Sequence, residues 1–79
     1  MKHMNIIGPN IRAWRRRRKL TQHKLAAKLR HAGHPVTRDM LANWETQRSA
    51  VSDWFIMGLA STLDIPIGKL FRPRIRKRG

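Results

Sequence analysis

The chain has 79 residues, enough for one domain with a small hydrophobic core. It contains no cysteine, so disulfides and thiolate metal sites are excluded, and it has no apolar run long enough to span a membrane. Eighteen Lys and Arg residues stand against four Asp and Glu residues, a formal net charge of +14 that favours polyanions, above all nucleic acid.

Both ends of the chain differ from its middle. We expect residues 1–5 to be a tag remnant or disordered and residues 6–71 to fold as one domain. Residues 72–79 are rich in Arg and Lys, and we expect them to form a disordered basic tail. No export signal is visible at the N-terminus, so we expect a cytoplasmic protein associated with the nucleoid.

The first predicted helix begins at Pro9, because proline at the first helical position loses no hydrogen bond. Ile11, Trp14 and Arg15 then share one face by helical spacing, with the first two in the core. An arginine beside core residues needs a partner, since an unpaired buried charge is strongly destabilising. We choose Glu45 among the few acids of the chain; the alternative is that Arg15 extends its head to solvent.

Two features before and within the second helix suggest phosphate contacts. The cations Arg15–Lys19 spread around the helix axis, so only some can meet one surface, and we assign Arg16 and Arg17 to the DNA backbone. Thr21 caps a helix that begins at Gln22, a position that either contacts phosphate or is an ordinary polar residue of the first turn. This helix runs to about residue 30 and turns inward Leu25, Ala26 and Leu29.

The next turn contains Gly33, which can take a positive φ at a helix end, and Pro35, which favours an extended approach. His23, His31 and His34 could suggest a metal site, but no cysteine or acid pair completes one. We therefore predict no metal and interpret the turn histidines as solvated.

The third predicted helix, residues 37–46, carries the pattern that best suits base recognition. Thr37 caps it, and a buried stripe consists of Met40, Leu41 and Trp44. Arg38, Asp39 and Asn43 remain on the open face, where Arg suits guanine, Asn suits adenine and an acid accepts from cytosine. The alternative is an amphipathic core helix with a solvated polar face.

The remaining elements are a loop and two helices. A polar loop with Arg48 follows the third helix, and Ser52 caps a fourth helix over residues 53–63. Asp64 stands where a left-handed residue commonly ends a helix, and a short last helix ends at Phe71.

Features of enzymes are missing from the sequence. It shows no glycine-rich phosphate loop, no paired carboxylates and no nucleophile with a base. We therefore expect neither enzymatic activity nor a cofactor.

Several segments together resemble the Cro and phage-repressor type of helix-turn-helix protein, the Xre family. They are IRAWR at 11–15, LTQ at 20–22, LA at 25–26, Leu29, VTR at 36–38, WE at 44–45, LA at 59–60, Leu63, Ile65 and LF at 70–71. The resemblance covers about residues 7–71. It implies an all-α, compact five-helix lambda-repressor-like domain whose second and third helices, joined by a lengthened turn, bind DNA.

The resemblance also implies roles for single residues. Arg15 and Glu45 match the structural ion pair between the first and third helices. The positions matching the major-groove face are Thr37, Arg38, Asp39 and Asn43, and those matching backbone contacts are Gln22, Gln47 and Arg48, with Gln47 in place of the usual glycine.

We therefore predict sequence-specific binding of double-stranded DNA by a prokaryotic or phage transcriptional regulator, repressor-like and homodimeric at least on DNA. Two alternatives remain. One is an antitoxin-type or adaptor protein whose protein partner docks on Trp54, Phe55 and Met57. The other is a cationic module that binds nucleic acid or membrane without sequence preference.

Overall fold

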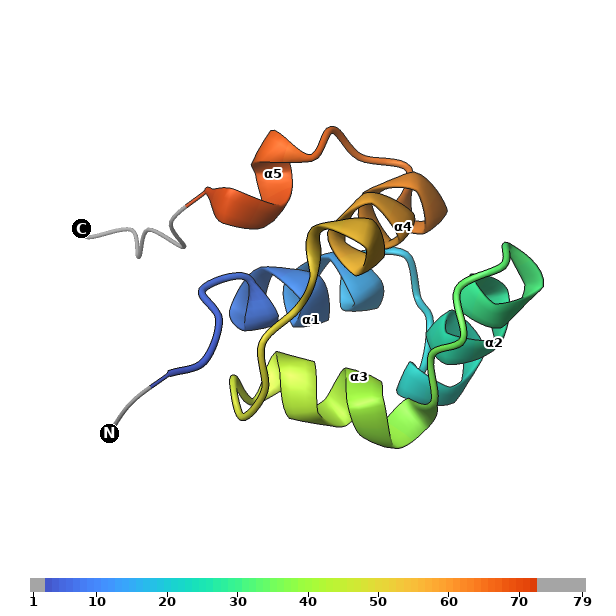
Figure 1. Ribbon diagram of the computed structural model, residues 1–79. Helices are drawn as coiled ribbons and strands as arrows, with labels where there is room; N and C mark the ends of the chain where they lie inside the picture. Colours follow the sequence, from blue (N-terminus) through green and yellow to red (C-terminus); the bar gives the residue numbers. More distant parts are fainter. Residues whose placement is uncertain (1–2, 73–79) are drawn as a thin grey trace.

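The computed structural model describes residues 3–72, and this part of the chain contains five α-helices and no strand. In chain order they are α1 (Gly8–Arg17), α2 (Gln22–His31), α3 (Arg38–Glu45), α4 (Asp53–Leu63) and α5 (Gly68–Phe71). Figure 1 shows α1 between α3 on one side and α4 and α5 on the other. The predicted all-helical fold of five helices is confirmed, and no helix in residues 3–72 is long and apolar enough to cross a bilayer.

Local sequence signals set the helix ends. The hydroxyls of Thr21, Thr37 and Ser52 each accept a hydrogen bond from the backbone N–H three residues later, at 3.0, 3.1 and 3.4 Å respectively. Asp64 ends α4 in the left-handed conformation with φ 58°, and Gly33 has φ 95° after α2. These caps and turns agree with the sequence prediction.

The hydrophobic core draws on every helix. Its fully buried members include Ile7, Ile11, Leu25, Leu29, Val36, Leu41, Leu59, Leu63 and Leu70. Ala26 is also buried, and its small side chain lets a neighbouring helix approach α2 closely. Trp14, which we expected in the core, is only partly buried and packs at the core's edge.

The N-terminal segment belongs to the fold from Met4 onwards. Its backbone N–H donates to the Gln47 carbonyl at 3.0 Å. The Asn5 side chain amide donates to the carbonyls of Trp44 and Ser49 at 3.1 and 2.8 Å. Met4 and Asn5, which precede the expected domain of residues 6–71, therefore make hydrogen bonds to the end of α3 and to the loop after it. Residues 1–2 and the tail 73–79 lie outside the described part.

The lengthened turn between α2 and α3 is attached to α4 through His34. The His34 ring lies 4.7 Å from the Trp54 ring, centroid to centroid. It also occupies the space above Gly58, where an added Cβ would come within 2.7 Å of the ring. His34 is thus half-buried instead of solvated, and its Nδ1 is buried without a hydrogen-bond partner in residues 3–72.

Candidate nucleic-acid interface

Helix α3 presents two chemically different faces. Leu41, Trp44 and Glu45 are buried, whereas Arg38, Asp39 and Asn43 are exposed. The Arg38 guanidinium lies 3.3 Å from the Asp39 carboxylate, but these side chains are 56% and 88% exposed, so water weakens the pair. All three candidate base-reading side chains are therefore accessible to a ligand.

The buried end of α3 is held by a polar cluster that joins three helices. Arg15 donates to both carboxylate oxygens of Glu45, from Nε at 2.7 Å and from Nη2 at 3.1 Å. Arg15 Nη1 also donates to the Leu20 carbonyl at 2.8 Å. The two charged side chains are only 11% and 2% exposed, so the structure brings the expected partners together as a buried ion pair.

Gln22 joins this cluster at the first residue of α2. Its Nε2 donates to Glu45 Oε1 at 3.1 Å, a contact that the sequence analysis did not foresee. The side chain is half-buried beside the helix N-terminus, where backbone N–H groups favour an anion. Glu45 therefore fixes the orientation of the residue expected to contact phosphate.

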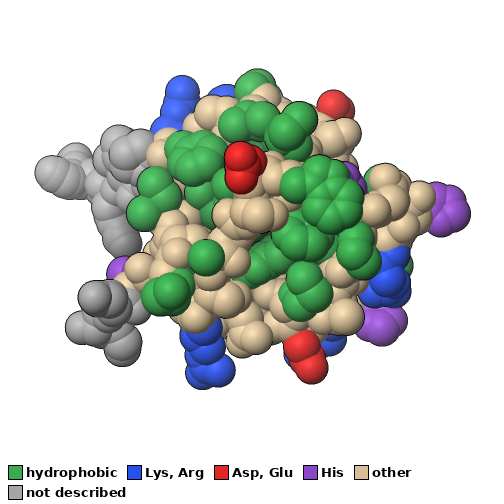
Figure 2. Space-filling model, in the orientation of Figure 1, with side chains coloured by type: hydrophobic (Ala, Val, Ile, Leu, Met, Phe, Trp, Pro, Cys, Tyr) green, Lys and Arg blue, Asp and Glu red, His purple; other side chains and the backbone are tan. Residues whose placement is uncertain are grey.

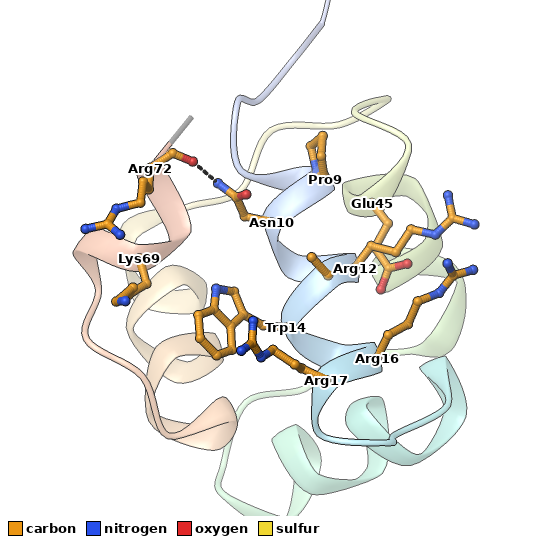
Figure 3. Close-up of a pocket in the computed structure, with 10 residues that line it drawn as sticks. Pro9, Asn10, Arg12, Trp14, Arg16, Arg17, Glu45, Lys69 and Arg72 are labelled. Carbon is orange, nitrogen blue, oxygen red and sulfur yellow. Dashed lines mark hydrogen bonds between the residues drawn. The ribbon is translucent and has the colours of Figure 1, made fainter. Parts of the chain in front are cut away.

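The structure separates the two cations that we grouped as backbone contacts. Figure 3 shows Arg16, with Arg12 one turn earlier, extending toward the side of α3 and Glu45, whereas Arg17 lies against Trp14 on the side of α5. Arg17 Cζ is 5.0 Å from the centroid of the Trp14 ring. Only Arg16 of this pair is adjacent to α3.

These side chains border an open cavity of about 1000 Å³ along α1, which we call the α1 groove. It is lined by Pro9, Asn10, Arg12, Ala13, Trp14, Arg16, Arg17, Glu45, Lys69 and Arg72. Five of these residues are cationic and one is acidic, so the groove carries a strong positive potential.

The loop after α3 places its two candidate contacts differently. Arg48 is exposed, and its backbone N–H donates to the Asn43 carbonyl at 2.8 Å. Gln47 is half-buried with φ 63°, the conformation for which the family glycine is suited, and its Nε2 donates to the Asn5 carbonyl at 2.8 Å. The Gln47 side chain is therefore directed toward the N-terminal segment.

Arg18 has a structural position that we did not predict. Its Nε donates to the Leu63 carbonyl at 2.7 Å and its Nη2 to the Asp64 carbonyl at 3.1 Å, so it closes the C-terminal end of α4. The sequence held one indication of this contact, because Arg18 shares a helical face with the core residue Ile11. Cations commonly bind the last carbonyls of a helix, such as those of α4.

The opposite character prevails on the face that Figure 2 shows. Hydrophobic side chains cover much of its centre, and Lys and Arg lie mainly near its edges. Trp54 and Met57 on α4 are 52% and 58% exposed. The described surface is therefore divided between cation-rich and apolar regions.

No group of three or more potential metal ligands occurs within residues 3–72.

Comparisons with known proteins agree with this architecture. A family model described as helix-turn-helix matches residues 11–70. No curated protein and no solved structure matches the chain. Because the family model spans most of the chain and the described residues form the expected helices, the chain belongs to the Xre, Cro and lambda-repressor-like helix-turn-helix family of DNA-binding proteins.

Proposed function

We propose that this protein binds a specific double-stranded DNA sequence with α3 in the major groove and acts as a repressor-like transcriptional regulator. The observation that carries this proposal is the exposure of Arg38, Asp39 and Asn43 on a helix that is anchored to the core by the buried residues Leu41, Trp44 and Glu45. The major groove of B-DNA is wide enough for one α-helix, and these side chains complement base edges there.

The expected division of contacts follows from where each side chain lies. Arg38 and Asn43 form bidentate pairs with bases, and Asp39 accepts from cytosine once DNA separates it from Arg38. The backbone contacts come from residues around this face, namely Gln22, Thr37, Arg48 and Arg16, joined by Arg12. We do not assign Gln47 or Arg17 to this duplex, because Asn5 and Trp14 engage their side chains.

Selection of bound duplexes from a random library tests the proposal. At about 0.15 M salt, where phosphate binding alone is weak, an enriched site is expected. The double variant Arg38→Ala, Asn43→Ala should lose discrimination at the positions that these residues contact, by roughly 1–3 kcal/mol for each bidentate pair.

A matched control is Lys28→Ala, Ser61→Ala. Like the test variant, it removes one positive charge and one neutral polar side chain, here from exposed positions on α2 and α4. It should retain the sequence preference of the parent. If the Arg38, Asn43 variant selects the same site as the parent, the base-reading role is refuted. If the parent enriches no site, binding depends on charge alone.

We further propose that the protein forms a homodimer on DNA through an uncharged groove. This groove has a volume of about 280 Å³ and is lined by Met4, Asn5, Ile6, Ile7, Ala50, Val51, Ile56 and Phe71. Two chains of net charge +14 repel each other, so they associate best through a charge-free surface while DNA neutralises the rest. Sedimentation of the complex with a two-fold-symmetric selected site should give two chains per duplex; one chain would contradict this proposal.

A protein partner on α4 is the second candidate function, favoured by the exposure of Trp54 and Met57. In that case the partner should shield Trp54 and shift its fluorescence while the DNA preference stays unchanged.

A further inference from the structure

Trp14 is surrounded by an unusual concentration of positive charge. The cationic groups of Arg17, Arg18 and Lys69 lie 5.0, 5.3 and 5.8 Å from the centroid of its ring. Arg18 is committed to the carbonyls at the end of α4. Arg17 and Lys69 form no ion pair with any acid in residues 3–72, so their charges remain uncompensated there.

The surroundings of these two cations add to the same potential. Arg12, Arg16 and Arg72 also line the α1 groove, and its acidic member Glu45 is already bonded to Arg15 and Gln22. Like charges held this closely repel each other, and an anion that enters the groove relieves this repulsion. The chemistry of the groove therefore suits a phosphate-rich ligand.

The Trp14 ring also restricts where the cations can go. A cation over an indole face is held there by the ring quadrupole, so the heads of Arg17 and Lys69 have lost part of their freedom before a ligand arrives. Such preorganisation lowers the entropic cost of binding. The three residues Trp14, Arg17 and Lys69, which we call the Trp14 site, therefore form a prepared anion-binding surface.

The position of the Trp14 site distinguishes it from the contacts around α3. Figure 3 shows Trp14, Arg17 and Lys69 on the α5 side of the groove, whereas Arg12 and Arg16 extend toward α3. A straight duplex held by α3 can reach Arg12 and Arg16, but α1 stands between it and the Trp14 site. We propose that the Trp14 site binds the sugar-phosphate backbone of a second DNA duplex, so that one domain can bridge two duplexes.

This inference rests on the proposed function for the duplex at α3. A bridging assay tests it: parent protein is bound to an immobilised duplex carrying the selected site, and retention of a second, fluorescent duplex is measured at about 0.15 M salt. The variant Arg17→Gln, Lys69→Gln should bind the immobilised duplex as the parent does. Two lost phosphate contacts should weaken retention of the second duplex roughly 30-fold, at about five- to sixfold for each contact.

The control variant Lys19→Gln, Lys28→Gln removes the same charge at exposed positions outside the groove and should bridge like the parent. Thermal unfolding checks that both variants fold, which is expected because the side chains of Arg17 and Lys69 make no hydrogen bond to a described residue. A homodimer that bridges through two α3 helices would be insensitive to the Arg17, Lys69 change.

Four results would overturn the inference. Equal loss of bridging in both double variants would show that total charge alone is responsible. Unchanged bridging by the Arg17, Lys69 variant would exclude the Trp14 site. If the Arg17, Lys69 variant binds the first duplex as weakly as the second, both residues belong to the contact of α3 with DNA. Retention of RNA or of an acidic peptide, but not of a second duplex, would assign the site to another ligand. If the parent protein enriches no sequence in the library selection, only the proposal for α3 fails. The proposal for the Trp14 site can still be tested, because bridging is also measurable with unselected duplexes.

Discussion

Replacing Glu45 by alanine is expected to destabilise the domain severely. The substitution removes the acceptor of two hydrogen bonds from Arg15 and one from Gln22. Arg15 then remains largely buried, with only the Leu20 carbonyl still accepting from it. A buried arginine without its carboxylate is the most costly state of such a pair.

The size of the effect follows from this burial. Removing one partner of a buried ion pair costs about 3–5 kcal/mol. A domain of 79 residues has a total stability of about 4–12 kcal/mol, so this single change removes a large share of it. The lower limit of about 3 kcal/mol corresponds to a fall in Tm of about 12–24 °C for a domain of this size.

Urea unfolding followed by tryptophan fluorescence and far-UV circular dichroism measures the loss. Asp39→Ala is the matched control: it also breaks an Arg–carboxylate pair on α3, but an exposed one, and should cost less than about 0.5 kcal/mol. Replacing both Arg15 and Glu45 by Met should cost less than Glu45→Ala alone, because no charge is then left buried. If Glu45→Ala and Asp39→Ala unfold at similar urea concentrations, Arg15 reaches water and the reasoning is refuted.

Two further substitutions test the backbone geometry. Gly8→Ala would place a Cβ against the Trp44 carbonyl oxygen, with the Glu45 carbonyl oxygen at 3.0 Å, and should lower the free energy of unfolding in urea by about 1–3 kcal/mol. Gly68→Ala is the control, because nothing lies within 4 Å of the added Cβ there. Equal urea midpoints for the two variants would show that α1 can move away from α3 freely. Lys19→Gly should raise the free energy of unfolding by up to about 1 kcal/mol. Lys19 has φ 59°, and left-handed backbone costs a non-glycine residue about 1–2 kcal/mol, which the entropy of glycine partly offsets. Thermal unfolding measures the change, and a lower Tm would contradict this prediction.

Features governed by local chemistry were predictable from the sequence. A hydroxyl before a helical pattern predicted the caps at Thr21, Thr37 and Ser52, because capping needs only the backbone of the next turn. The scarcity of acids made Glu45 identifiable as the partner of Arg15, since few alternatives existed.

Features that depend on where long side chains end were not predictable. Arg16 and Arg17 are neighbours in sequence, yet helical geometry turns them toward different elements. The position of the Arg17 guanidinium depends on its contact with the Trp14 ring. The contact of Gln22 with Glu45 depends on the crossing of α2 and α3, which periodicity does not specify. Asn5 was missed because its single amide donates to one carbonyl of α3 and to one of the loop after it, both far away in the sequence and without any repeating pattern.

The separation of exposed and buried positions along α3 has a consequence for evolution. The side chains of Arg38 and Asn43 make no hydrogen bond or ion pair to another helix in the described part of the chain, so either can change without a compensating change elsewhere. Glu45 can change only together with Arg15 and Gln22. A lineage of regulators built on this fold can therefore exchange one target for another by single steps, each of which leaves a folded protein. Among diverging copies, we expect variation at 38 and 43 and coordinated retention at 15, 22 and 45.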